Sequence, residues 1–258
     1  MFRPSARKRY INLLRELAIA QFKLKDQSAF LGFLWSFLHP LVMIGILFAL
    51  FKVKAGQSIE HYAIYLLIGV VQYTYFSNST SRSMTVLYSM RQLTSDAIFP
   101  KEVLVLSGVI ADSVEFAFSM LICIVIAVLS GVVLSSAILL LPLVWVLQFV
   151  LVLSVSLLLS CLYVFVRDVA HIYQAFLRVL LFITPIFYDM SFLEAGPGRY
   201  ILWLNPLAHL IHFSRAVIIG GSPFPVGSSM LLLLATCALF FCSLKIFKNY
   251  EPTFTENL

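Results

Sequence analysis

LVWVLQFVLVLSVSLLLSCLYVFV, residues 143–166, carries no charged side chain from end to end. A helix that crosses the ~30 Å hydrocarbon core of a bilayer needs roughly 20 predominantly apolar residues. This stretch is therefore long and apolar enough to span a membrane, and it predicts that the chain is a membrane protein.

The composition of the whole chain agrees with this stretch. Hydrophobic residues make up 61% of the 258 residues and charged residues only 12%, which does not suit a single water-soluble core. The sequence lacks the alternating segments of about 10 residues that are typical of a membrane barrel. We therefore expect an all-α integral membrane protein. Its N-terminus, basic and followed by a charged helix, does not have the pattern of a cleavable signal.

Six apolar runs predict six transmembrane helices, which places both termini on the same side of the membrane. Basic residues gather before the first run, in the second-to-third and fourth-to-fifth loops and after the last run. The positive-inside rule therefore predicts that both termini are cytoplasmic. The predicted spans are residues 31–51, 62–81, 109–129, 143–166, 172–188 and 229–247.

The N-terminal residues predict a helix that lies in the membrane interface. Over residues 7–26, one helical face carries Leu13 and Leu17 while Arg15 and Glu16 lie opposite. A soluble helix packed on a domain is the alternative. We expect residues 1–30 to form the cytoplasmic N-terminus with this helix and residues 31–258 to form one transmembrane domain, whose cytoplasmic tail is residues 248–258.

Residues 27–40, QSAFLGFLWSFLHP, connect the interfacial helix to the first span. Gly32 allows a sharp turn or a close approach of helices there, and Pro40 lies far enough inside the span to kink it. The residues that we expect to shape this entrance are Ser28, Leu31, Gly32, Trp35 and Pro40.

Two connections between spans have unusual sequences. Residues 89–108 mix charged and apolar side chains, and Ser95 can cap a short helix just ahead of Pro100. This segment predicts a docking helix, with a solvated loop as the alternative. Residues 189–228 are too apolar for a soluble loop and are broken at Asn205-Pro206, which predicts a re-entrant external segment.

Several kinds of chemistry have no motif in this sequence. It contains no Gly-x-x-x-x-Gly-Lys-[Ser/Thr] loop, so any ATP is expected to be handled by another chain. His209 and His212 could share a helix face, but a metal site needs more ligands than two. We therefore expect no catalytic residues, no metal and no cofactor in this chain.

Polar and aromatic side chains within the spans allow two interpretations each. Arg178 lies near the middle of the fifth span and either lines an anion-accommodating path or pairs with Asp112 or Glu115. The aromatic residues form either interfacial belts or a stacking surface for sugar rings. Those near the external side that we consider for the stacking surface are Tyr73, Tyr75, Phe76, Phe182, Phe187 and Tyr188.

Three stretches carry a resemblance when they are taken in order. They are SAFLGFLWSFLHPL (28–41), VFVRDVAHIYQAFLRVLLFITPIFY (164–188) and NPLAHLIHFSR (205–215). Together with the missing nucleotide motif, they resemble the membrane subunits of type-2 ABC exporters for cell-surface polysaccharides, namely O-antigen, capsule and teichoic acid permeases. The short external loops and the Leu-Gly-x-x-Trp entrance favour this group over drug exporters of the same fold.

The resemblance implies a homodimer in the bacterial inner membrane with a channel between its copies. Two copies of a separate ATPase subunit would bind ATP and Mg²⁺. The substrate would be a polysaccharide, O-antigen first among the candidates, linked to undecaprenyl pyrophosphate, and no nucleic acid would be bound. Two alternatives remain. One is export of a capsule polysaccharide, teichoic acid, drug or small lipid, and the other is a membrane enzyme that acts on lipid-linked sugars.

The resemblance also implies roles for particular residues. The coupling helix on the ATPase would include Ser95, Asp96, Ile98, Phe99, Pro100, Lys101 and Glu102. Basic groups near the lipid pyrophosphate would be Lys23, Lys25 and Arg167, although Arg167 and Asp168 can instead pair and cap the fifth span. The external gate helices would include Asn205, Pro206, His209, His212 and Arg215.

Overall fold

A computed structural model describes the chain over residues 6–26, 42, 45–46, 61–96, 99–134, 136–190, 200, 202, 204–220 and 226–257. Every regular element within these residues is a helix, which confirms the all-α prediction. Most of the first predicted span, and its entrance with Ser28, Leu31, Gly32, Trp35 and Pro40, lie outside the described residues, as does Ile98.

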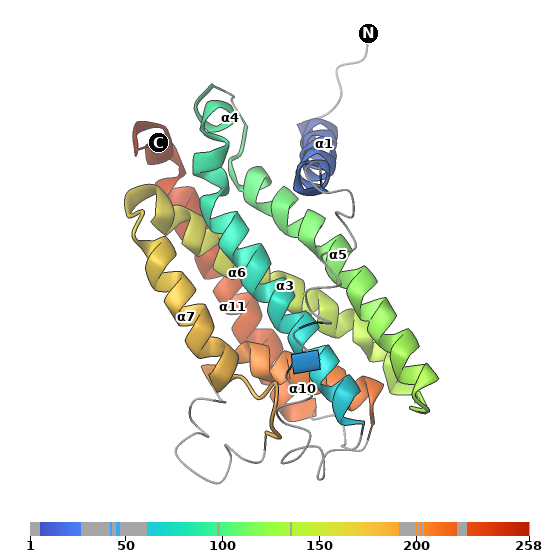
Figure 1. Ribbon diagram of the computed structural model, residues 1–258. Helices are drawn as coiled ribbons and strands as arrows, with labels where there is room; N and C mark the ends of the chain where they lie inside the picture. Colours follow the sequence, from blue (N-terminus) through green and yellow to red (C-terminus); the bar gives the residue numbers. More distant parts are fainter. Residues whose placement is uncertain are drawn as a thin grey trace.

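The longer of the described helices run along a common bundle (Figure 1). They are α1 (Ala6–Asp26), α3 (Tyr62–Ser89), α4 (Arg91–Asp96), α5 (Glu102–Leu129), η1 (Ser136–Leu140), α6 (Leu141–Phe165), α7 (Val169–Ile183), α10 (Pro206–Ile218), α11 (Val226–Tyr250), η2 (Glu251–Thr253) and α12 (Phe254–Asn257).

Helix α3 lies at the centre of the bundle. It packs against α5, α6, α7 and α10, while α11 packs on α6 and α1 packs on α5. Figure 1 shows α1, α4 and α12 at one end of the bundle and α10 at the other. We call these the α4 end and the α10 end. Among the described residues, three helical stretches are long and apolar enough to cross a membrane: Glu102–Leu129, Ser136–Phe165 and Met230–Thr253.

Local sequence explains where several helices begin and end. Helix α5 ends in a Schellman motif, in which Gly131 adopts φ +86°, its N–H donates to Val128 O at 3.0 Å, and the N–H of Val132 donates to Ala127 O at 3.1 Å. Helix α10 begins with Pro206 in its first turn, and the Asn205 carboxamide oxygen accepts from the N–H of Ala208 at 3.3 Å. The break predicted at Asn205-Pro206 is therefore the start of a helix.

Several predicted boundaries differ from the observed ones. Helix α3 continues to Ser89 rather than ending at residue 81, and α5 already begins at Glu102 rather than at residue 109. Hydropathy marks only the apolar part of a helix, whereas these helices continue past it. The prediction that Ser95 caps a helix is wrong, because Ser95 lies in the last turn of α4, which begins at Arg91.

The C-terminal residues do not extend away from the bundle as a tail. The Phe254 side chain of α12 is fully buried, and its ring lies 5.2 Å from that of Phe247 and 6.2 Å from that of Phe165. The Glu251 carboxylate in η2 accepts a hydrogen bond from the backbone N–H of Lys101 at 2.6 Å. These contacts attach the end of the chain to α6, α11 and the start of α5.

Candidate functional site: a polar cleft between α3 and α7

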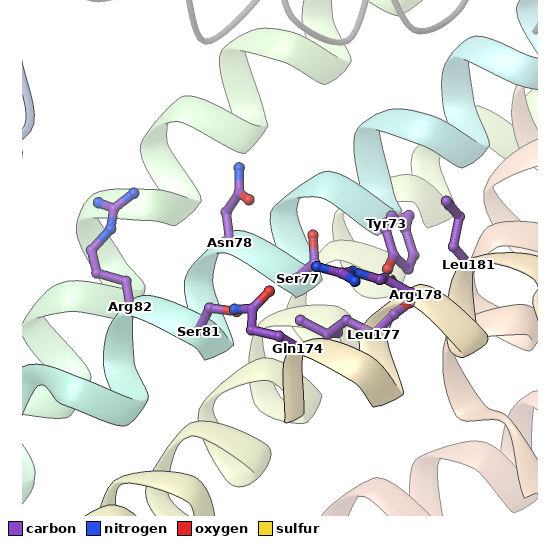
Figure 2. Close-up of a pocket in the computed structure, with 9 residues that line it drawn as sticks. All are labelled: Tyr73, Ser77, Asn78, Ser81, Arg82, Gln174, Leu177, Arg178 and Leu181. Atoms are coloured by element: carbon purple, nitrogen blue, oxygen red, sulfur yellow. Dashed lines mark hydrogen bonds between the residues drawn. The ribbon is translucent and has the colours of Figure 1, made fainter. Parts of the chain in front are cut away.

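A cleft of about 520 Å³ lies between α3 and α7. Most of its lining residues are polar, although they occupy the middle of two helices in a strongly apolar chain. Asn78, Gln174 and Arg178 are exposed to the outside of the subunit. The lining residues are Tyr73, Ser77, Asn78, Ser81, Arg82, Gln174, Leu177, Arg178 and Leu181 (Figure 2).

Hydrogen bonds made by side chains of α3 and α7 hold the two helices side by side. The Tyr73 hydroxyl donates to Leu177 O at 2.5 Å, and the hydroxyls of Thr80 and Tyr173 are hydrogen-bonded at 2.6 Å. Nearer the surface, the Gln174 amide donates to Ser81 Oγ at 3.2 Å. The polar faces of the two helices are therefore held in register by side-chain bonds.

Two arginines give the cleft its positive charge. Arg82 Nη1 lies 2.7 Å from Asp112 Oδ1, and this carboxylate is buried under α3. The alternative in which Asp112 pairs with Arg178 is therefore wrong, because α3 extends far enough to place Arg82 beside it. Figure 2 shows Arg178 reaching from α7 toward Ser77 and Tyr73, with Arg82 at the other end of the cleft.

Helix α7 presents opposite characters on its two faces. Gln174 and Arg178 face the cleft, one helical turn apart. Ile172, Phe176 and Val179 are exposed on the other side of the helix. The cleft is thus a polar strip beside an apolar surface that suits lipid.

The candidate aromatic residues divide into several environments. Tyr73 lines the cleft. Tyr75 and Phe76 are buried inside the subunit, where the Tyr75 ring stacks on Phe116 at 4.4 Å, so neither offers a ring face to a sugar. Phe187 is also buried, whereas Phe182 is exposed and the Tyr188 hydroxyl donates to Phe182 O at 2.9 Å.

Arg215 of α10, one of the residues predicted for the external gate helices, is buried. Its guanidinium donates to three backbone carbonyls: Tyr65 O at 2.9 and 3.1 Å, Pro185 O at 2.7 Å and Ile186 O at 2.8 Å. It also lies over the Tyr65 ring, with Cζ 3.3 Å from the ring centroid. We call this arrangement the Arg215 clamp, because it joins α10, α3 and the segment after α7.

The Arg215 clamp requires a glycine on α3. A Cβ atom on Gly69 would lie 2.5 Å from Arg215 Nη2, which is too close for two non-bonded atoms. The Asn205 amide adds a second bond from the α10 side, to Thr184 Oγ1 at 2.9 Å. Sequence reasoning missed the partners of Arg215, because backbone carbonyls leave no signature in a sequence.

The two histidines of α10 lie beside an aromatic residue rather than in a ligand cluster. The rings of His209 and His212 are 6.3 and 6.4 Å from that of Phe213. Within the described residues, no three His, Cys, Asp or Glu side chains lie close enough together to hold a metal ion.

The segment predicted to couple to an ATPase lies at the α4 end. Thr94 anchors α4, because its hydroxyl donates to Leu87 O at 3.1 Å. Leu93 and Pro100 are exposed, whereas Phe99 is partly buried against the core and Lys101 is buried. Ser95 and Asp96 lie in the last turn of α4, and Glu102 begins α5. Leu93, which the residue-level prediction did not include, is the large apolar side chain that α4 exposes.

The described basic candidates at this end lie on different elements, Lys23 on α1 and Arg167 just before α7. Arg167 lies over the Tyr88 ring, with Cζ 4.6 Å from its centroid. Asp168 occupies the N-cap position of α7, but its side chain makes no capping hydrogen bond. Lys23 is exposed on α1, and the side chain of Lys25 lies outside the described residues.

With this geometry established, comparison with known proteins gives the family. The family model described as "ABC-2 type transporter" matches residues 12–219, most of the chain. The chain belongs to the ABC-2 type transporter family. The family that the three ordered stretches indicated is therefore confirmed.

Individual relatives of this ABC-2 chain are known by name. It is 26% identical over 250 residues to "O-antigen export system permease protein RfbA" of Myxococcus xanthus, covering 96% of each chain. It is 26% identical over 212 residues to the protein of that name from Klebsiella pneumoniae, covering 82% of each. It is 21% identical over 224 residues to "Polysialic acid transport protein KpsM" of Escherichia coli, covering 86% of each.

Proposed function

We propose that this chain is the channel-forming permease subunit of an ATP-driven exporter. The cargo would be a polysaccharide carried on undecaprenyl pyrophosphate, and O-antigen is the polysaccharide we propose. The relatives named as O-antigen permeases match nearly the whole chain in one case and about four fifths of it in another, which supports this choice. Two copies of the chain would enclose the path, and two copies of a separate ATPase subunit would bind ATP and Mg²⁺.

The proposed topology has six spans with both termini in the cytoplasm of a bacterium, in its inner membrane. Helices α3, α5, α6, α7 and α11 supply five of them, and the chain between α1 and α3 supplies the first. The position of α1 and α12 together at the α4 end supports a common side for the termini. Helix α10, which begins at Pro206 and is shorter than a full span, would be a re-entrant gate helix.

The observation that carries the proposal is the polar cleft between α3 and α7. Exposed amide and guanidinium groups in the middle of membrane helices are costly against lipid, so they normally face a partner or a water-filled path. Asn78 and Gln174 can exchange hydrogen bonds with sugar hydroxyls, and Tyr73 offers a phenol ring at the edge of the same surface. Facing the same cleft on a second copy, this surface would line a path for a polar polymer.

The charge of the cleft suits the anionic end of the cargo. Arg82 is already paired with Asp112, so its guanidinium is partly neutralised. Arg178 makes no ion pair with any residue of the described ranges and is exposed. We therefore assign attraction of the pyrophosphate to Arg178 in the cleft, with Arg167 near the α4 end as an earlier contact.

The α4 end is where we place the ATPase. A short helix can transmit motion only through a firm contact, and α4 is anchored to α3 by Thr94 while it presents Leu93 outward. Phe99 and Lys101 lie between α4 and α5 and connect this contact to the bundle. Force applied to α4 would thus reach α3 and α5 together.

Replacement of Arg178 by Gln tests the function of the cleft. We expect Arg178→Gln to reduce export and to leave lipid-linked polymer in the cytoplasm, while the folded protein accumulates normally. The matched control is Lys245→Gln, which removes an exposed positive charge from α11. If the Arg178 variant exports as much as the control does, Arg178 does not line the path. If a strain that lacks this chain accumulates no polymer in the cytoplasm, a drug or small-lipid exporter is favoured instead.

Replacement of Leu93 by Asp tests the ATPase contact. We expect Leu93→Asp to leave the protein inserted but to abolish stimulation of the ATPase by the permease, because a charge would replace the apolar contact. Phe99→Asp should also uncouple transport, with an added loss of stability because this side chain is partly buried. Normal stimulation in the Leu93 variant would contradict the assigned contact, and glycosyl transfer by the purified chain alone would contradict the transporter assignment.

A further inference from the structure

A second cavity, of about 500 Å³, lies between α1 and α5, and we call it the α1–α5 groove. Its lining residues are of two kinds, since eight are apolar and the other two are basic. They are Ile11, Leu14, Arg15, Ala18, Ile19, Phe22, Lys23, Ile110, Ala111 and Val114.

The groove is built on a firm contact between the two helices. The Gln21 amide donates to Leu104 O at 3.1 Å and to Ser107 Oγ at 2.6 Å. A Cβ atom on Gly108 would lie 2.7 Å from Gln21 Oε1, so the helices meet closely at that point. The wall that α5 provides belongs to an apolar stretch long enough to span the membrane. We therefore expect the groove to open toward the hydrocarbon rather than toward water.

The basic residues occupy one edge of the groove. Arg15 and Lys23 lie four residues before and four residues after Ile19, so all three project along the same side of α1. Ile11 and Ile19 are exposed beside them. An apolar trough with a guanidinium and an ammonium group along its rim matches a molecule with hydrocarbon chains and a phosphate headgroup.

The groove is separate from the cleft that we assign to the cargo. Figure 1 places α1 and α5 on one side of α3 and α7 on the other. The same division is visible along α3, where the Tyr75 ring stacks on Phe116 of α5 while the Tyr73 hydroxyl bonds to Leu177 of α7. An occupant of the groove would therefore stay outside the path for polysaccharide.

We propose that the α1–α5 groove binds an anionic phospholipid of the surrounding bilayer, with its acyl chains on the apolar wall and its phosphate between Arg15 and Lys23. This site would hold α1 in the plane of the membrane interface. The inference goes beyond the proposed function, because it requires only that the chain resides in a membrane and not that it exports polysaccharide.

The test uses a tryptophan at the rim of the groove and lipids that quench its fluorescence. The full chain with Ile19→Trp is reconstituted in vesicles that contain brominated phosphatidylglycerol or brominated phosphatidylcholine. The signal of the unsubstituted chain is subtracted. We expect roughly a 10- to 30-fold preference for phosphatidylglycerol, since two basic side chains each contribute to attraction of an anionic headgroup. Ile11→Trp provides a second reporter if the first variant does not fold.

Three controls make the result specific. Leu121→Trp places the reporter on an exposed part of α5 outside the groove, where we expect no preference. Combining Arg15→Gln and Lys23→Gln with the reporter should abolish the preference. The charge-matched pair Lys8→Gln and Arg9→Gln, which lies outside the groove, should retain it.

Equal quenching by the two lipids at residue 19 would overturn the proposal, as would a preference that survives loss of both rim charges or that appears equally at residue 121. Displacement of the brominated phospholipid by an added undecaprenyl-pyrophosphate oligosaccharide would also overturn it, by assigning the groove to the cargo lipid. Export is not measured in this test, so failure of the lipid site leaves the proposed function standing.

Discussion

In a water-soluble protein, polar side chains are mostly exposed and apolar side chains are mostly buried. Helices α3 and α11 show the opposite pattern. Helix α3 is the more polar, yet Gln72, Ser79 and Thr80 in it are completely buried. Helix α11 is long and apolar, yet Leu234 and Phe241 expose more than 60% of their surface. Among the described helices, α11 contains a stretch that is long and apolar enough to cross a membrane, whereas α3 falls short of that measure although it contains the predicted span at residues 62–81.

The difference shows what each helix contacts. The exposed leucine and phenylalanine side chains of α11 suit lipid, in which no hydrophobic force drives them inward. Some polar side chains of α3 bond to neighbouring helices, as Thr80 Oγ1 does to the Tyr173 hydroxyl at 2.6 Å, and others line the polar cleft. The Gln72 carboxamide and the Ser79 hydroxyl are buried without a hydrogen-bond partner among the described residues. Polarity in this fold therefore marks the helix around which the other helices assemble.

Removal of the Arg215 clamp should break the packing around α3 most severely. Arg215→Leu leaves the carbonyls of Tyr65, Pro185 and Ile186 without their donor, and each buried unsatisfied group costs about 1–3 kcal/mol. We expect a loss of at least about 3 kcal/mol in the free energy of unfolding. Thermal unfolding in detergent measures this, with Arg91→Leu on the exposed surface of α4 as the control; equal unfolding temperatures for the two variants would show that the clamp is not structural.

A charge on the lipid-facing surface of α11 should have the next largest effect. Leu234→Asp places a carboxylate where we expect lipid, at a cost of about 2.5–3.5 kcal/mol near the centre of a membrane helix. The amount of protein that inserts into membranes is the readout. Leu234→Phe keeps the surface apolar and should insert normally, and tolerance of Asp would mean that this surface of α11 faces protein or water.

Loss of one bond between α3 and α7 should cost less. Tyr173→Phe removes the hydroxyl that bonds to Thr80, for which we expect about 1 kcal/mol. Tyr163→Phe is the matched control, because it removes a tyrosine hydroxyl from α6, which the bond between α3 and α7 does not involve. Chemical denaturation of the two variants should separate them, and identical stabilities would indicate that packing alone holds α7 to α3.

Removal of an unbonded hydroxyl from α3 should have the smallest effect. Ser79 Oγ is buried and has no hydrogen-bond partner within the part of the chain that the structure describes, so Ser79→Ala should leave stability unchanged or raise it by no more than about 1 kcal/mol. Thr80→Val, one residue along, removes a hydroxyl with partners and should destabilise the protein. A greater loss for Ser79→Ala than for Thr80→Val would reverse this interpretation of the polar groups of α3.

The long apolar helices were predictable from the sequence because their composition is sufficient to identify them. The predicted span at residues 143–166 differs from α6 by one or two residues at each end. The ends of α3 and α5 were not predictable from hydropathy, since Arg82 and Glu102 are charged and yet belong to helices. Helix α7 ends at Ile183, just before Pro185, although the apolar sequence continues beyond it.

The candidate site was predictable in its residues more than in its contacts. Arg178 and Tyr73 were identified as polar or aromatic groups at membrane depth, and the structure places both in one cleft. The pairing of Asp112 with Arg82 was missed because Arg82 had been assigned to a loop. Tyr75 differs from Tyr73 by two positions and faces away from the cleft, a distinction that depends on helix rotation.

The hydrogen bond from Lys101 to Glu251 gives the last residues of the chain a mechanical consequence. It connects the beginning of α5 to the turn that follows α11, so two helices far apart in sequence are joined at the α4 end. A tilt of either helix there would strain the other unless this bond broke first. The residues after α11 therefore help to hold the region around α4 in place, and a movement of α5 at this end would also displace the end of the chain.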